Sequence, residues 1–198
     1  MRYTIGIDEV GRGPLAGPVV VCAVALPDTL AQRGAMRSHS SNKLSALHDS
    51  KKLTPKQRDA WYAHLTRHPR IRYAVARVYP RQIEKRNISR AANLAAWRAF
   101  TRLAVRGRVF LDGGLFLKDK AHSASLKAKT IIKGDENIPA VAMASIIAKV
   151  TRDRFMKRMA EHYPGYGFEL HKGYGTRAHL AAVRRIGPSP IHRRTFLS

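Results

Sequence analysis

The sequence has only one cysteine, Cys22, among its 198 residues. A single cysteine excludes an intrachain disulfide and a zinc site built on several cysteines. It also suits a reducing compartment, so we expect a cytoplasmic location. Because Cys22 lies within an apolar run, we interpret it as a small buried hydrophobic residue.

Acidic residues are also scarce: 13 Asp and Glu stand against 37 Lys and Arg, which gives a formal net charge of +24 at pH 7. This surplus of positive charge indicates a polyanionic partner, and nucleic acid is the first choice. Charge alone does not separate an enzyme from a protein that only coats RNA. A non-catalytic, basic RNA-binding protein is therefore one alternative to an enzyme, and the motifs must distinguish between the two.

Long hydrophobic runs are absent as well. No apolar stretch approaches the roughly 20 residues that a membrane-spanning helix requires, so no membrane partner is expected. The first four residues lead into an apolar strand without a signal-peptide pattern. Hydrophobic residues still make up 44% of the chain, which is enough for a globular core. The length predicts one domain over residues 1–198, with residues from about 163 to 198 as a small C-terminal extension.

Apolar patterning predicts an α/β domain with a mixed sheet. The first strand starts at Ile5, and further strands are expected at 19–26, 71–79, 109–111 and 130–132. Thr54, Pro55 and Gln57 form a capping box that begins a helix. Further helices are expected at about 82–106, from about 139, and from 177 to 185. Residues 27–48 show no clear periodicity and are interpreted as a loop.

Acidic residues stand where several of these strands end. Asp8 and Glu9 end the first strand, Asp112 ends another, and Asp135 follows a third. Ligands of α/β sheets bind at the carboxyl ends of the strands, so we expect Asp8 and Asp112 to converge on one site. In so basic a chain, neighbouring carboxylates make most sense if metal ions lie between them.

The adjacent pair needs a local departure from regular structure. Neighbouring residues of a strand point to opposite faces, so Asp8 and Glu9 cannot both face one site in ideal geometry. We expect the chain to leave regular pairing at Glu9, helped by the glycines that follow.

Gly11 and Gly13 bracket Arg12 directly after these acids. A dinucleotide-binding loop is excluded because a strand follows where a helix should begin. Glycines without a Cβ allow the backbone to approach a ligand closely, and arginine offers a planar fork of donors to phosphate or sugar. We therefore favour a binding loop over a plain hairpin connection.

Other polar residues stand out against their surroundings. Ser145, Lys149 and Arg152 form one polar stripe on a nearly continuous apolar helix, so we expect them to emerge beside the site and meet phosphates. Asp153 is expected to pair with Lys149 or a nearby arginine. Tyr174 lies between two glycines and is expected on an exposed loop, as a packing lid or as a stacking platform.

The residues Asp8-Glu9-Val10-Gly11-Arg12-Gly13 resemble the Asp-Glu-x-Gly-Arg-Gly signature of the type 2 ribonucleases H, and specifically the bacterial ribonuclease HII family. Two later blocks resemble the family in the same order. They are Asp49-Ser50-Lys51-Lys52-Leu53 and the stretch from Lys133-Gly134-Asp135 to Arg152-Asp153. The resemblance covers most of the chain and implies a ribonuclease H-like fold, with helices flanking the sheet and a small helical C-terminal extension.

The resemblance also implies an activity: endonucleolytic cleavage of RNA in RNA–DNA hybrids and of single ribonucleotides embedded in duplex DNA. The cut lies on the 5′ side of the ribonucleotide and leaves a 5′-phosphate. The implied cofactors are Mg²⁺ or Mn²⁺, two ions with substrate bound, and we expect the enzyme to act as a monomer. The implied catalytic and metal-binding residues are Asp8, Glu9, Asp112 and Asp135. The implied substrate-binding residues are Gly11, Arg12, Gly13, Ser50, Lys51, Lys52, Ser145, Lys149, Arg152 and Tyr174.

A second alternative is another metal-dependent nuclease on the same fold, such as a junction resolvase. The glycine-bracketed Arg12 and the Tyr174 loop argue against it, because the resemblance assigns them to reading the ribose 2′-hydroxyl and the junction with DNA. That hydroxyl allows a protein to distinguish RNA from DNA.

Overall fold

The computed structural model describes residues 2–32, 53–117 and 128–197. Its centre is a five-stranded mixed sheet in the order β3-β2-β1-β4-β5. β1 and β2 pair antiparallel, as do β2 and β3, whereas β1, β4 and β5 run parallel to one another. The strands are β1 Tyr3–Val10, β2 Val19–Pro27, β3 Arg72–Val78, β4 Arg108–Asp112 and β5 Ala128–Ile131. The predicted α/β class with a mixed sheet is confirmed.

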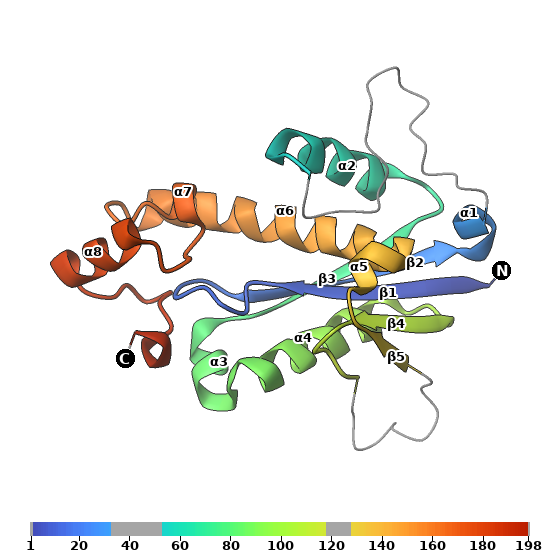
Figure 1. Cartoon of the computed structure of the whole chain (residues 1–198), viewed down its shortest axis with the longest axis horizontal. Helices are drawn as coiled ribbons and strands as arrows, with labels where there is room; N and C mark the ends of the chain where they lie inside the picture. The colour runs from blue at the N-terminus through green and yellow to red at the C-terminus, as the bar shows by residue number, and fades with distance from the viewer. Residues whose placement is uncertain (1, 33–52, 118–127, 198) are drawn as a thin grey trace.

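Helices cover both faces of this sheet (Figure 1). The long α6 crosses one face together with α2, α4 crosses the other, and α7 and α8 lie at the far end of α6 beside the C-terminus. The helices are α1 Asp28–Gln32, α2 Pro55–Arg67, α3 Pro80–Arg86, α4 Ile88–Leu103, α5 Gly134–Asn137, α6 Pro139–His162, α7 Phe168–His171 and α8 Arg177–Ile186, with a 3-10 turn at Arg194–Phe196. Among the described residues, no helix is both long and apolar enough to cross a membrane.

The alternation of β2 explains how one strand serves two cores. Side chains at 19, 21, 23 and 25 pack with the alanines of α4, whereas those at 20, 22, 24 and 26 pack with α2 and α6. Both sets are fully buried, which is why the sequence of β2 is continuously apolar rather than alternating. Cys22 belongs to the second set and is buried, as expected.

A third, smaller core lies in the C-terminal part of the chain. Met156 of α6 packs there with Ala16 from the connection between β1 and β2. Tyr166, Phe168 and Ala182 complete the cluster. This core ties residues beyond 163 to the β1–β2 connection, so the end of the chain supports the segment that follows Asp8 and Glu9.

Several local predictions are confirmed. The Thr54 hydroxyl accepts from the backbone N–H of Gln57, and the Gln57 side chain accepts from the backbone N–H of Thr54, so the capping box begins α2. Trp61 and Leu65 form its buried face. Thr176 caps α8, and Gly187 follows its end.

Other predictions about the helices were wrong. The single helix expected at about 82–106 is two helices, because Asn87 has a φ of 65° and its side chain accepts from the N–H of Arg90 to cap α4. α4 ends at Leu103, with Ala104 in the left-handed region. The stretch read as a loop begins with α1, and positions 33–48 of it lie outside the described residues.

Gly6 sets the distance between β1 and α6. A Cβ at this position would lie 2.1 Å from the backbone carbon of Ala140 and 2.2 Å from the nitrogen of Val141. Real side chains do not tolerate such contacts, so only glycine allows the first turn of α6 to seat directly on the strand. The seat brings the middle of α6, including Ser145, alongside Asp8.

We therefore expect Gly6→Ala to lower the free energy of unfolding by about 1–3 kcal/mol, because the methyl group must displace backbone rather than a flexible side chain. Urea unfolding measures this change. Gly13→Ala is the matched control: nothing lies within 4 Å of a Cβ there, so its effect should stay within about 0.5 kcal/mol. Equal stability of the two variants would contradict the close seating of α6.

Candidate active site

A cavity of about 310 Å³ lies at the carboxyl ends of β1 and β4. Asp8 and Glu9 enter it from β1, Asp112 from the last position of β4, and Ser145 and Lys149 from α6. Its remaining walls are Val10, Arg58, Ile146 and Tyr174. Three of the four predicted acids thus line one cavity, together with side chains from α2 and from the loop before α8.

The predicted break at Glu9 was wrong. β1 stays in register with β2 through Val10, with Asp8 opposite Cys22 and Glu9 opposite Val21. Pairing of β1 with β4 instead ends at Ile7. β1 therefore extends past β4, its parallel neighbour. Beyond Ile7 the edge of β1 that faces β4 is unpaired with that strand, so side chains from either face of the sheet can reach it.

Asp8 is 5% exposed, and several influences act on its charge. Burial raises the pKa of Asp8 well above its ordinary value, and the negative charges of Glu9 and Asp112 add to that effect. The Ser145 hydroxyl and the backbone N–H of Glu9 oppose it by hydrogen-bonding to the carboxylate, the latter at 2.7 Å. The site thus concentrates negative charge where water is largely excluded.

Glu9 shares this environment but has a cationic partner. Burial raises the pKa of Glu9, and Arg12 opposes the shift from 3.3 Å, between its Nη1 and Glu9 Oε1. Glu9 Oε2 is buried and accepts no hydrogen bond from the residues that the structure describes. The Arg12 guanidinium also donates to the carbonyl of Gly114 and the hydroxyl of Ser89, so it links the end of β1 to α4.

The remaining acids are held by the turn that begins α5. The backbone N–H of Gly134 donates to Asp112 Oδ1 at 2.7 Å, which fixes the orientation of that carboxylate. Asp135 follows Gly134 in sequence and is 2% exposed. Asp135 is not among the described residues that line the cavity, although its neighbour contacts Asp112 directly.

Arg152 does not meet phosphates, and that prediction was wrong. Its side chain is fully buried, and its three nitrogens donate to the backbone carbonyls of Pro18, Lys172 and Ala16 at 2.9–3.0 Å. A Cβ on Gly11 would lie 2.3 Å from Arg152 Nε, so the space beside Gly11 is filled by this arginine rather than open to a ligand. Arg152 braces the loop that follows the acids.

Arg193 is a second buried brace, and the sequence analysis missed it. Its guanidinium donates to the carbonyls of Gly11, Arg12 and Gly17, with Gly11 at 2.6 Å and Arg12 at 2.8 Å. These partners stand more than 170 positions earlier in the chain, so no local pattern could indicate the contact. The backbone around Arg12 is thus held by a side chain from the C-terminal segment.

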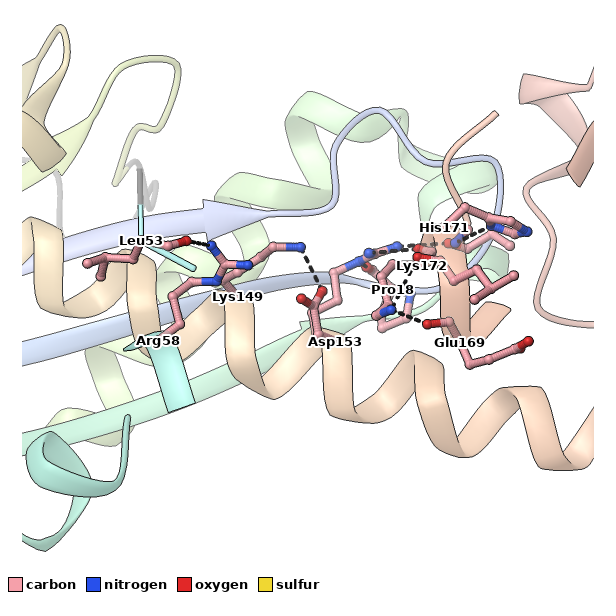
Figure 2. Close-up of polar contacts among 12 residues, drawn as sticks. Pro18, Leu53, Arg58, Lys149, Asp153, Glu169, His171 and Lys172 are labelled. Atoms are coloured by element: carbon pink, nitrogen blue, oxygen red, sulfur yellow. Dashed lines mark hydrogen bonds and ion pairs between the residues drawn. The ribbon is translucent and has the colours of Figure 1, made fainter. Parts of the chain in front are cut away.

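A basic groove of about 470 Å³ adjoins the acid cavity and shares Arg58 and Lys149 with it. Figure 2 shows Lys149 and Asp153 on one face of α6, with Arg58 from α2 beside them. Lys149 Nζ lies 2.7 Å from Asp153 Oδ1, which confirms the predicted pair. Further cations of the groove are Arg154, Lys157 and Lys172. Its acids are Asp153, Glu169 and Asp59, which pairs with Arg154 at 2.9 Å, so five cations face three acids. Ser50, Lys51 and Lys52 lie outside the described residues.

Tyr174 is 41% exposed and lines the acid cavity. The guanidinium carbon of Arg152 lies 5.8 Å from the centroid of the Tyr174 ring. Arg152, which holds the connection after β1, therefore also supports this tyrosine. Its part in substrate recognition stays a prediction.

The donor set suits a hard cation. Within residues 2–32, 53–117 and 128–197, no three His, Cys, Asp or Glu side chains stand together as a complete metal cage. Mg²⁺ does not require one, since it keeps waters and binds through one or two carboxylates plus substrate phosphate. The carboxylates are crowded, and Glu9 Oε2 is buried without a hydrogen-bond donor among the described residues, which fits such a partly filled coordination sphere.

Comparison with known proteins decides the family. The family model described as ribonuclease HII matches residues 5–198. The chain belongs to the ribonuclease HII family. It is therefore a type 2 ribonuclease H, an endoribonuclease.

Individual relatives agree with this family. A ribonuclease HII of Coxiella burnetii is 42% identical over 192 residues, which cover 96% of this chain and 86% of the relative. The crystal structure of ribonuclease H2 from Pyrococcus horikoshii aligns with a TM-score of 0.75 and 25% identity, covering 98% of this chain and 93% of that one. Bst-RNase HIII, solved in complex with Mn²⁺, has a TM-score of 0.64 at 18% identity and covers 99% of this chain and 65% of that one. The last likeness shows the fold alone.

Asp8→Asn should stabilise the metal-free protein at neutral pH. Folding raises the pKa of Asp8, so its ionisation lowers the stability of the folded protein. This loss of stability is absent at a pH below the ordinary carboxyl pKa, grows as the pH rises toward the raised pKa, and is complete above it. We expect a gain in the free energy of unfolding at pH 7, and we expect this gain to disappear near pH 3, where the carboxyl is protonated in both states. Urea unfolding in the presence of a chelator measures it.

Asp153→Asn is the control for this measurement. It removes a carboxylate that is already paired with Lys149 at a partly exposed position, so it should bring no gain in stability. A loss of stability in Asp8→Asn at neutral pH would contradict the inference that the buried charge of Asp8 destabilises the metal-free protein.

Proposed function

We propose that this type 2 ribonuclease H cleaves the RNA strand of RNA–DNA hybrids and also cuts at single ribonucleotides embedded in duplex DNA. The cut lies on the 5′ side of the ribonucleotide and leaves a 5′-phosphate. The observation that carries the proposal is the cavity in which Asp8, Glu9 and Asp112 face Lys149 and Tyr174. It combines a cluster of acids with a cation and a partly exposed aromatic ring, which suits a phosphodiester attached to a ribose.

We infer that Asp8, Glu9, Asp112 and Asp135 hold Mg²⁺ or Mn²⁺, two ions with substrate bound. When bound, such ions supply an activated water and stabilise the charge on the leaving oxygen. The Mn²⁺ complex of Bst-RNase HIII, which has the same fold, supports a divalent cation. Ser145 orients Asp8 for this task, and the N–H of Gly134 orients Asp112.

The basic groove is the proposed track for the phosphate backbone. Arg58 and Lys149 stand where the groove meets the acid cavity, so a strand passing along them would enter beside Asp8 and Asp112. Lys157 and Lys172 extend the positive charge away from the acids. This track replaces the role first expected of Arg152.

Recognition of the ribose is assigned to the loop of Gly11, Arg12 and Gly13 and to Tyr174. Reading a 2′-hydroxyl requires donors and acceptors held close to the sugar. The guanidinium of Arg193 binds the carbonyls of Gly11 and Arg12 and supplies the rigidity such a reading needs. That of Arg152 holds the carbonyl of Ala16 further along the same connection. Tyr174 provides a face on which the neighbouring sugar can stack.

Asp8→Asn should abolish cleavage while folding and substrate affinity persist. The amide keeps the shape of the side chain but loses the charge that a cation requires. The assay is product mapping on a DNA duplex that contains one ribonucleotide, with and without Mg²⁺, alongside an affinity measurement on the same duplex. Cleavage near the wild-type rate would remove Asp8 from the metal site, and a product cut elsewhere than 5′ of the ribonucleotide would point to a different nuclease.

Tyr174→Ala should reduce kcat/KM on the single-ribonucleotide duplex by about tenfold, the equivalent of one lost stacking contact. Affinity for plain DNA duplex should change little. Tyr79→Ala is the matched control, because Tyr79 is also an exposed tyrosine but does not line the acid cavity. Equal losses on both substrates would indicate a general contribution to binding rather than recognition of the ribonucleotide.

A further inference from the structure

Three histidines stand in contact behind the Tyr174 loop. His171 ends α7, His179 lies in the first turn of α8, and His192 lies in the C-terminal segment. The rings of His171 and His179 stack with centroids 4.3 Å apart, and those of His179 and His192 are 5.1 Å apart. His179 is fully buried and His192 is 3% exposed.

Their hydrogen bonds form one consistent chain if all three rings are neutral. The backbone N–H of Ser189 donates to His192 Nδ1 at 2.9 Å, so the proton of His192 is on Nε2. That Nε2–H donates to His179 Nε2 at 3.0 Å, which leaves the proton of His179 on Nδ1. The chain ends where His179 Nδ1–H donates to the carbonyl of Tyr174 at 2.9 Å.

His171 holds the other side of the same residue. Its Nδ1 accepts from the backbone N–H of Gly173 at 3.1 Å, and its Nε2–H donates to the carbonyl of Tyr166 at 2.8 Å. The N–H of Gly173 and the carbonyl of Tyr174 are therefore each bound to a buried or half-buried imidazole.

Three of these bonds end on an accepting ring nitrogen: Gly173 N–H to His171 Nδ1, Ser189 N–H to His192 Nδ1, and His192 Nε2–H to His179 Nε2. They require the neutral form of the accepting ring, since a protonated imidazole has no acceptor nitrogen. The bond from His179 Nδ1–H to the Tyr174 carbonyl survives protonation, so a proton on one of these rings breaks the links that hold His179 and Gly173 in place.

We propose that His171, His179 and His192 are positioning residues that hold Tyr174 at the acid cavity while they are neutral, and that protonation of this relay releases the loop and weakens the reading of single ribonucleotides. The inference rests on the proposed role of Tyr174 in recognition. The relay does not touch the acids, so it acts on specificity rather than on hydrolysis itself.

The surroundings oppose a proton at neutral pH. Burial lowers the pKa of His192 from 6.5 to about 4, with the proximity of His179 and His171 adding to it, and burial likewise lowers the pKa of His179. The neighbouring rings are those of Tyr166 and Phe168. The charged side chains on the elements around the relay are mostly basic. They are Arg152, Asp153, Arg154, Lys157, Arg158 and Glu161 on the later turns of α6, Glu169 and Lys172 of the α7 region, Arg177, Arg184 and Arg185 of α8, and Arg193. Cations outnumber acids among these described residues.

The sign of the pH effect follows. Folding lowers the pKa of His179 and His192, so below about pH 6.5 these two rings gain a proton more readily in the unfolded chain than in the folded one. The stability of the C-terminal segment therefore falls as the pH falls toward 4. Recognition of the ribonucleotide should weaken in the same direction, because the loop is the part released.

Two variants of His179 separate hydrogen bonding from packing. His179→Asn can still donate to the Tyr174 carbonyl from its side-chain amide, whereas His179→Phe fills the stack without any donor. We expect His179→Phe to lose about fivefold in kcat/KM on a single-ribonucleotide duplex, the loss of one hydrogen bond, and His179→Asn to lose less. His162→Gln is the control, since His162 is exposed on α6 outside the relay. A smaller loss in His179→Phe than in His179→Asn would overturn the proposal.

The pH readout is the ratio of kcat/KM on the single-ribonucleotide duplex to that on a long hybrid. Titration of the acids affects both substrates alike and cancels in the ratio. The ratio should hold near pH 7 and fall as the pH approaches 4 in the wild type, and it should fall much less in His179→Asn. A ratio independent of pH in the wild type would overturn the release of the loop.

Nitrogen NMR of the histidine rings tests the relay without any activity measurement. At pH 7 we expect the proton of His179 on Nδ1 and those of His171 and His192 on Nε2. A cationic His192 or the opposite tautomers would refute the relay even if Tyr174 acts as proposed. If the tautomers are as expected but Tyr174→Ala cuts single ribonucleotides normally, the proposed function of the loop fails and the relay is structural only.

Discussion

The structure depends on how closely α6 approaches β1. That helix carries Ser145 and Lys149 into the acid cavity, and its later turns carry Arg152 into the loop after the acids. All three are placed by one contact, in which the backbone of Ala140 and Val141 rests on Gly6 with no side chain between them. Because the helix is rigid, an error of an ångström at this contact would be carried along its length to the Ser145–Asp8 hydrogen bond and to the bracing of residues 16–18.

The negative charges in the acid cavity repel one another. Its carboxylates are crowded and desolvated, although the chain has nearly three basic residues for every acid. Arg12 pairs with Glu9, but Lys149 pairs with Asp153 rather than with an acid of the cavity. The stored repulsion is released when positive charge enters, so the same arrangement that costs folding free energy favours a cation. Destabilised carboxylates of this kind are common at functional sites.

The parts of this arrangement that could be read from the sequence are local. The capping box of Thr54 and Gln57, the buried strand β2 and the acids at strand ends each have short-range signals. The break at Asn87 has none, because positive φ at a non-glycine residue depends on context. Arg152 was misjudged because a polar stripe on a helix does not show whether its partners are solvent, phosphate or backbone carbonyls. The hydrogen bonds of the Arg193 side chain span more than 170 positions, and the three histidines come from separate elements, so pattern and spacing record neither.

The carbonyls of Gly11, Arg12 and Gly17 find their donors on a side chain about 180 positions later. During synthesis, β1 and β2 can pair as soon as both have left the ribosome, but the backbone around Arg12 has no partner for these carbonyls until Arg193 emerges. The conformation of the connection between β1 and β2 is therefore completed by a residue made long after both strands. A chain that lacks Arg193 can still pair β1 with β2, but it leaves the carbonyls of Gly11, Arg12 and Gly17 without the guanidinium that binds them.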